Sequence, residues 1–350
     1  MTEPDQQSRR ATTGSASVPG KRRGLRRIAA GLAVVASAGV IAGELVARYH
    51  YQLGDPPLSR NDPEIGYLFQ PNQTCRRLHH LIHYNAWSMR SRDFPLRKAD
   101  PRELRVMVVG DSVINGGVLT DQAEVGTSLL ERDLAARLGR PVVVGNVSSG
   151  GWGPLNEWPY LRRFGTFDAD VLVLVESSHD AFSPFQGDRV AGVDPSFPDR
   201  RPCCALWEAV TRYLPRYLPS RYVAPSNEGY QEPVFDEAVL AANLAAVRSM
   251  IDLGKARGAR VLVALHWTQT ELRQAAAQPG FRPRGHVEIA AAAAADGAQV
   301  LDLGPAEQAA GPRAYRDDIH VGPVGQRVME QQLLAALAPA DRAPAPPPSP

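Results

Sequence analysis

The chain has 350 residues, 44% of them hydrophobic and 22% charged, which is ordinary for a globular protein with one large domain or two small ones. The formal net charge of +2 gives no overall basic character, so composition does not predict a nucleic-acid partner. Cys75, Cys203 and Cys204 lack the spacing of a zinc site. A disulfide from Cys75 and three free thiols both remain compatible with this pattern.

An apolar stretch near the N-terminus predicts a membrane span. Residues 1–27 are polar and end in a basic cluster, and we expect a disordered cytoplasmic tail. The segment of residues 28–47 is long and apolar enough to span a bilayer. The basic residues that precede it favour the cytoplasmic side of the membrane for its N-terminal end. We therefore expect a single-pass anchor, with the rest of the chain on the extracytoplasmic (periplasmic or extracellular) side. The small residues at positions 36–38 also suit signal-peptide cleavage, which is the alternative.

Residues 48–103 form a polar, proline-punctuated leader. It is predicted to be irregular, with room for short strands. Its large apolar side chains, among them Ile65, Phe69 and Trp87, favour burial. We expect this leader to pack on the domain that follows rather than to act as a free linker.

Short apolar runs alternate with helical patterns over residues 104–337. The predicted strands are residues 105–110, 142–147, 171–176, 260–266 and 299–303, and the predicted helices are residues 127–138, 155–164, 236–257, 286–296 and 325–337. This alternation predicts an α/β domain with a doubly wound, flavodoxin-like parallel sheet of about five strands and helices on both faces. A proline-rich insert at residues 183–234, with one helix expected at residues 206–218, interrupts the pattern, and residues 338–350 are expected to be a disordered tail.

Ser112 is the first candidate for chemistry. It follows the predicted strand that ends in Gly110, and open α/β sheets bind ligands at the carboxyl ends of their strands. An ester hydrolase needs a nucleophile, a base, a group that orients the base, and donors for the oxyanion. Ser112 would be the nucleophile. A serine that merely caps the next helix is the alternative.

Asp317 and His320 supply the other two groups. They follow the last predicted strand and are three residues apart, a spacing that places both on one side of a helical turn. The carboxylate would accept from one imidazole nitrogen while the other faces Ser112. His266, at the end of the fourth predicted strand, would either reach the same edge or be a hydrogen-bonded core residue.

Glycines and a histidine follow the second and third predicted strands. Gly151 lies where a backbone N–H would approach a bound carbonyl, and the N–H of Ser112 would be a second donor. His179, in the sequence Ser-Ser-His-Asp, would donate a third hydrogen bond from its ring. A plain strand-to-helix turn and a capping Asp180 are the alternatives.

In this order, the motifs resemble the four signature blocks of the SGNH, or GDSL-like, hydrolase family. Gly-Asp-Ser at residues 110–112 matches the first block, the glycine at 150 or 151 the second, and Asp317 with His320 the last. The third block departs from the family, because His179 stands where the family has an asparagine that completes the oxyanion hole. The leader is similar to that of membrane-anchored bacterial members.

The resemblance implies a serine esterase with no metal or organic cofactor. Its substrate would be an acyl ester, such as an acetyl ester, of a glycan, lipid or small molecule. An acyltransferase that uses the same residues on an envelope polysaccharide is one alternative, and a degenerate glycan-binding domain is another. The membrane is the other expected partner, through residues 28–47, and the sequence does not define an oligomeric state.

Overall fold

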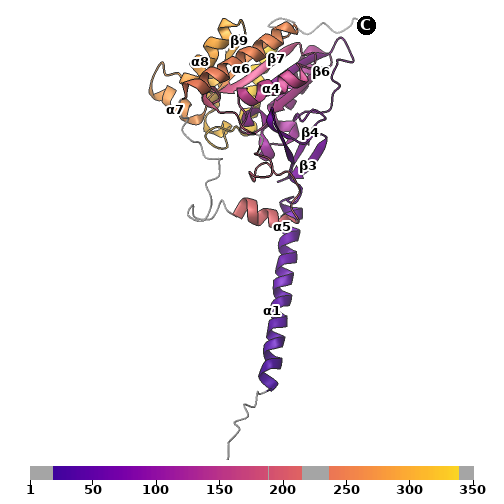
Figure 1. Ribbon diagram of the computed structural model, residues 1–350. Coiled ribbons are helices and arrows are strands. Elements are labelled where there is room, and N and C mark those ends of the chain that lie inside the picture. Colours follow the sequence, from indigo (N-terminus) through magenta and orange to yellow (C-terminus); the bar gives the residue numbers. More distant parts are fainter. Residues whose placement is uncertain (1–18, 188, 215–235, 339–350) are drawn as a thin grey trace, which may run out of the picture.

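The computed structural model describes residues 19–187, 189–214 and 236–338. Helix α1 (Pro19–Leu45) projects from the domain, and a π-helical turn, Val46–His50, continues it (Figure 1). Its segment Gly24–His50 is long and apolar enough to cross a membrane, and its apolar window is not buried in the protein. An anchor and a signal sequence both fit this helix. Most of the two predicted tails lies outside the described residues.

A five-stranded parallel sheet forms the centre of the domain, as predicted. Its strands lie in the order β6-β5-β7-β8-β9, which is the flavodoxin-like order. They are β5 (Leu104–Gly110), β6 (Val142–Ser148), β7 (Val171–Ser177), β8 (Arg260–His266) and β9 (Gln299–Asp302). Each predicted strand agrees with the structure to within one residue at either end, because strands covered on both faces are continuous apolar runs.

Helices cover both faces of this sheet (Figure 1). Met107 and Val109 of β5 point into one apolar core and Val106 and Val108 into the other, as strand alternation requires. The first core packs against α4 (Pro154–Phe164), α6 (Glu237–Ala256) and α8 (Arg284–Ala295), and the second against α3 (Gly126–Leu138) and α10 (Pro323–Leu337). The short helix α2 (Ser112–Asn115) was not predicted, and neither were α7 (Gln269–Ala277) and α9 (Gly304–Ala310).

The leader forms two antiparallel hairpins. They pair β1 (Ser59–Asp62) with β2 (Gly66–Phe69) and β3 (Gln73–Arg77) with β4 (His80–Tyr84). Ile65, Leu68 and Met89 are buried in the same core as α4 and α6. The leader therefore completes one face of the domain. In the insert, the described part holds α5 (Ala205–Glu208) and a π-helical turn, Ala209–Tyr213, while residues 215–235 lie outside the described residues.

Arg90 ties the leader to the loop that follows Ser112. Its side chain is fully buried, and its guanidinium donates to the carbonyl oxygens of Asn115 at 2.8 Å, Thr120 at 2.5 Å and Gly117. Burial lowers the pKa of Arg90, yet a guanidinium stays charged at neutral pH. One leader residue thus supplies the donors that fix the backbone after the candidate nucleophile.

We expect Arg90→Met to lower the free energy of unfolding by about 3–5 kcal/mol, because several buried carbonyls lose their donor at once. The free energy of unfolding of Arg90→Lys should lie between those of the wild type and Arg90→Met. An ammonium group keeps the charge but lacks the planar, forked set of N–H donors with which a guanidinium reaches several carbonyls at once. Urea unfolding of the two variants would measure this. Arg102→Met, at an exposed surface pair, is the matched control and should leave the midpoint unchanged. Equal midpoints for Arg90→Met and this control would contradict the role of Arg90.

Candidate active site

Ser112 lies on a tight turn between a strand and a helix. Strand β5 ends at Gly110, where a Cβ would come within 2.7 Å of the Val175 carbonyl oxygen, so only glycine fits. Ser112 then opens α2 (Ser112–Asn115), and the carboxylate of Asp111 caps this helix by accepting from the Val113 N–H at 2.8 Å. The turn presents the Ser112 hydroxyl at the carboxyl edge of the sheet.

The structure brings Ser112, His320 and Asp317 together in one chain of hydrogen bonds. His320 Nε2 lies 2.9 Å from Ser112 Oγ, and His320 Nδ1 lies 2.8 Å from Asp317 Oδ2. Residues 208 positions apart in the sequence thus meet at one edge of the sheet. This is the geometry in which a histidine accepts a serine proton while a carboxylate fixes its tautomer.

Asp317 and His320 lie in a short loop, not on the helical turn that their spacing suggested. A bridge between Tyr315 and Val321 closes the loop, and Asp317 Oδ1 accepts the backbone N–H groups of Ile319 at 3.0 Å and His320 at 2.7 Å. Burial opposes ionisation of Asp317, but its bonds to His320 and the loop backbone outweigh this and lower its pKa. Asp317 is therefore a carboxylate at neutral pH.

His266 supports this loop from the neighbouring strand. It is fully buried at the end of β8, with Nδ1 2.5 Å from Glu307 Oε1 and Nε2 2.9 Å from the Ile319 carbonyl oxygen. Both ring nitrogens face acceptors, so the ring is an imidazolium. Burial disfavours that charge, but Glu307 and the Ile319 carbonyl raise the pKa of His266 to about 9. His266 is thus a core residue that also holds the backbone between Asp317 and His320.

A hydrogen bond from the leader fixes the loop after β6 that contains Gly150 and Gly151. The hydroxyl of Tyr67 donates to the Gly150 carbonyl, and Gly151 has a φ of +73°. Because carbonyl and N–H point in opposite directions across a trans peptide, the Gly151 N–H points away from Tyr67. A Cβ on Gly150 would lie 3.8 Å from Ser112 Cβ, so this loop borders the serine. Tyr67 was not singled out from the sequence, because only the fold brings the leader here.

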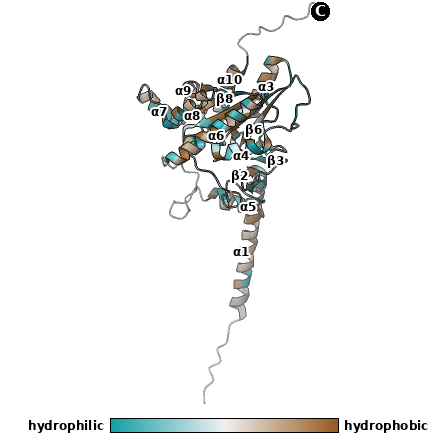
Figure 2. Cartoon of the chain, turned by 45° about the horizontal axis from the view of Figure 1, so that its top comes forward, coloured by the Kyte–Doolittle hydropathy of each residue, from teal (hydrophilic) through white to brown (hydrophobic). Residues whose placement is uncertain are grey.

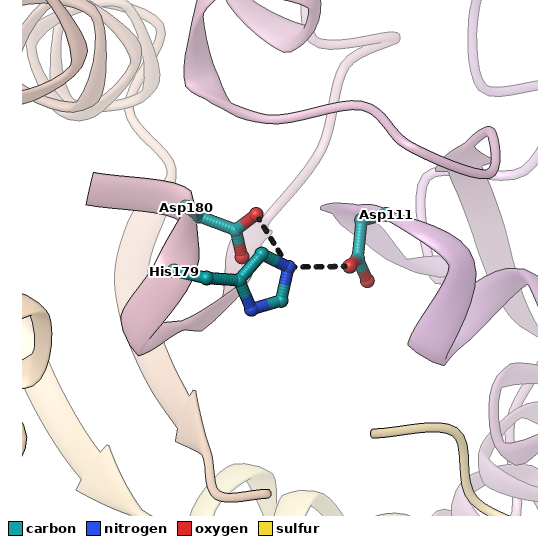
Figure 3. Close-up of side chains that lie close together, drawn as sticks. All are labelled: Asp111, His179 and Asp180. Atoms are coloured by element: carbon teal, nitrogen blue, oxygen red, sulfur yellow. Dashed lines mark ion pairs between the residues drawn. The ribbon is translucent and has the colours of Figure 1, made fainter. Parts of the chain in front are cut away.

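His179 lies between two buried carboxylates (Figure 3). Its Nε2 is 3.8 Å from Asp111 Oδ2 and 3.5 Å from Asp180 Oδ1, beyond hydrogen-bond length. Its Nδ1 is buried and has no hydrogen-bond partner among the described residues. Burial lowers the pKa of His179, whereas burial raises the pKa of Asp111 to about 6 and of Asp180 to about 7.

The same three side chains are of the types that bind metal ions, and they lie close enough together to hold one. Within the described part of the chain, ligand atoms of Asp111, His179 and Asp180 lie within 4.8 Å of one another. One oxygen of each carboxylate is already used, because Asp111 accepts from Val113 and Asp180 accepts from Ser177 at 2.7 Å. The remaining oxygens and the imidazole therefore face one another beside the serine turn.

Two further carboxyl groups lie behind this cluster. Glu157 on α4 and Glu176 on β7 are both fully buried. Burial, together with the nearby acidic groups, raises the pKa of each well above its usual value. Burial therefore favours the protonated form of both groups. The sequence carried no signal for this pair, because their proximity arises only from packing α4 on the sheet.

The sequence profile of the GDSL-like Lipase/Acylhydrolase family matches residues 108–328. The match covers more than half of the chain and includes all the residues of the hydrogen-bonded chain described above. The chain belongs to this family. It is a hydrolase that acts on ester bonds. None of the curated protein sequences compared with this GDSL-like hydrolase matches it.

Solved structures of esterases are similar to the domain at low sequence identity. A variant of an acetyl-xylooligosaccharide esterase from Geobacillus Stearmophilus is 13% identical, with 66% of this chain and 93% of that chain covered and a TM-score of 0.43. The lipase/acylhydrolase from Enterococcus faecalis is 16% identical, with 67% and 95% covered and a TM-score of 0.39.

The pair of His266 and Glu307 generates a prediction about pH. The folded pKa of His266, about 9, lies above its unfolded value, so the pair's stabilisation is complete below about pH 6.5 and is lost as the pH rises through 9. We expect Glu307→Gln to lower the free energy of unfolding by about 3–5 kcal/mol at pH 7, because it leaves a buried charge without its partner.

Urea unfolding of the wild type and Glu307→Gln at pH 7 and pH 10 would measure this difference. The deficit of the variant should shrink at pH 10, where His266 is neutral in both proteins. Glu237→Gln, at an exposed ion pair on α6, is the control and should show no pH-dependent deficit. An equal deficit for Glu307→Gln at both pH values would mean that Glu307 does not act through the charge of His266.

Proposed function

We propose that this hydrolase is a serine esterase in which Ser112 is the nucleophile, His320 the general base and Asp317 the residue that orients it. The observation that supports this assignment is the continuous chain of hydrogen bonds from Ser112 Oγ through His320 to Asp317. A serine hydroxyl is a weak nucleophile at its own pKa, and an adjacent imidazole activates it. The Asp317 carboxylate stabilises the imidazolium that forms.

In this mechanism Ser112 Oγ attacks the acyl carbon while its proton passes to His320 Nε2. The tetrahedral intermediate collapses as His320 returns the proton to the leaving alcohol, which gives an acyl-Ser112 ester. Water then attacks the acyl carbon, with its proton passing to His320, and Ser112 leaves with that proton. Atoms and protons balance over the two steps, and the acid and the alcohol are the products.

The oxyanion would be held by the backbone N–H groups of Ser112 and Gly151 and by the ring of His179. A neutral imidazole carries one proton, so donation from Nδ1 requires Nε2 to be an acceptor. The raised pKa of Asp180, about 7, leaves a carboxyl proton available on that side of the ring near neutrality. Nδ1 is buried and has no hydrogen-bond partner among the described residues, so the protein itself leaves this ring position unused.

We further propose that residues 28–47 anchor the protein and that residues 104–337, with the insert at 183–234, form the catalytic domain on the extracytoplasmic side. The projecting apolar helix and the basic residues before it support this orientation. The substrate would be an acyl ester, acetyl esters included, of a glycan, lipid or small molecule at the cell envelope.

Covalent labelling with a fluorophosphonate tests the nucleophile. We expect one label per wild-type chain, none on Ser112→Ala, and loss of p-nitrophenyl acetate hydrolysis by about 10⁴-fold or more in that variant. Ser249→Ala, on α6, is the matched control and should label normally. Treatment with EDTA should leave the rate unchanged, because no step uses a metal. Labelling of Ser112→Ala at the wild-type level would remove Ser112 from the mechanism.

Substitutions of His179 test the third oxyanion donor. His179→Ala should lower kcat by about 10²–10³-fold, the usual cost of losing one such donor. His179→Asn keeps an N–H at this position and should stay within about tenfold of the wild type. Steady-state kinetics on the two variants would decide the point. Equal rates for them would show that the ring does not hold the oxyanion.

A further inference from the structure

A short helical segment of the insert lies across the end of α1. It comprises α5 and the π-helical turn after it, and together with Leu214 we call residues 205–214 the crossing segment. In both views the crossing segment lies at the end of α1 nearest the domain, and in Figure 1 it runs roughly perpendicular to α1 (Figures 1 and 2). The domain lies on one side of this segment and α1 extends away on the other.

The inner face of the crossing segment is fixed to the domain. Ala205 and Glu208 are buried, and Glu208 pairs with the fully buried Arg77 at the end of β3. The second oxygen of Glu208 accepts the Gly54 N–H at 2.7 Å. This buried pair sets which side of the crossing segment faces the domain.

Glu44 fixes the start of the crossing segment to α1. Its carboxylate accepts the backbone N–H groups of Ala205 at 3.2 Å and Leu206 at 2.7 Å, which are unpaired donors of a first helical turn. Leu206 packs on Gly43, where a Cβ would come within 3.3 Å of the leucine side chain. The single charge of the apolar stretch is therefore used to cap a helix of the insert.

The outer face of the crossing segment is apolar and exposed. Trp207 is 55% exposed, Val210 43% and Leu214 47%, and their spacing of three and four residues places them along one side of the helix, which the buried Glu208 does not share. Tyr49, in the π-helical turn after α1, is 73% exposed, and Tyr51, directly after that turn, is 49% exposed. Tyrosine and tryptophan gather at the boundary between lipid and water.

An apolar hollow of about 270 Å³ lies in the angle between α1 and the crossing segment. It is lined by Val40, Ile41, Glu44, Leu45, Cys204 and Leu206. The residues of α1 that line this hollow lie near the end of the apolar stretch at residues 28–47. A lipid acyl chain fits both its lining and its position.

The position along α1 agrees with a bilayer boundary. Counted from Arg27, the last residue of the basic cluster, about 20 residues of helix span about 30 Å of hydrocarbon and end near Ala47. Gly43 then lies about 24 Å along the span, within about one helical turn of the outer boundary. A helix packed there presents its outer face to the region between acyl chains and headgroups.

We propose that residues 205–214 lie in the outer interface of the bilayer, with Trp207, Val210 and Leu214 inserted among the lipids. This inference rests on the anchor proposed above. The crossing segment is then a second membrane contact, rigidly joined to the domain through Arg77 and to the anchor through Glu44. It holds the catalytic domain at a set height and rotation above the lipid surface.

Lipid quenching of tryptophan fluorescence tests the proposal. The full chain is reconstituted into phosphatidylcholine vesicles, with and without lipid brominated near the headgroup end of its acyl chains. The emission of Trp207 is obtained as the difference between the wild type and Trp207→Phe. Brominated lipid should quench this emission several-fold more strongly than the emission that remains in Trp207→Phe, because the other tryptophans belong to the domain. Trp158→Phe, on α4, is the matched control and should leave the quenched component in place.

The outcomes separate this inference from the proposals on which it rests. Wild-type protein that fails to float with the vesicles would overturn the anchor, and the inference with it. Protein that floats but shows no quenching assigned to Trp207 would overturn the inference alone. Hydrolysis of p-nitrophenyl acetate by Trp207→Phe should equal that of the wild type, which confirms that the substituted protein is folded.

Discussion

The contact between Ser112 and His320 depends on all strands of the sheet pointing the same way. Parallel strands end at a common edge, so loops from distant parts of the chain are delivered to one surface. Strand β9 is nevertheless three strands away from β5, a separation of about 14 Å. The loop that carries His320 must therefore return across the edge. Hydrogen bonds from the end of β8 and the start of α7 hold the loop there. Gln269 of α7 donates to the carbonyl oxygens of Asp318 at 2.8 Å and Asp317 at 2.6 Å.

Buried cations hold the backbone on both sides of the site. Arg90 donates to carbonyls after Ser112, and the His266 imidazolium donates to the carbonyl before His320. A buried charge is costly unless its hydrogen bonds are complete, so such a group tolerates few alternative geometries. The Arg90 guanidinium is satisfied largely by peptide oxygens, whereas His266 also has Glu307. These contacts restrict the loops that carry Ser112 and His320 to positions in which the two side chains meet.

The sheet could be predicted from the sequence, but few of the tertiary contacts that support the candidate site could be. The five strands were found because a strand buried on both faces is a continuous apolar run. Helices α7 and α9 were missed because they are short and only partly apolar. Asp317 and His320 were paired by their spacing, although an aspartate-capped loop and not a helical turn brings them together. The contacts of Glu307, Tyr67 and Arg90 depend on tertiary packing, which no local pattern encodes.

The insert contacts both the loop beside Ser112 and, through the crossing segment, the proposed membrane anchor. Phe197 packs on Gly150, where a Cβ would lie 3.1 Å from its ring, so the insert borders the loop beside Ser112. Ala205, where the crossing segment begins, is only eight residues further along. A single spanning helix leaves a domain free to rotate about the helix axis, whereas a second contact at the lipid surface removes that freedom. In the arrangement that we propose, the same insert would fix the direction in which Ser112 faces. Substrates held at or near the bilayer would then gain access over those that must diffuse from bulk solvent.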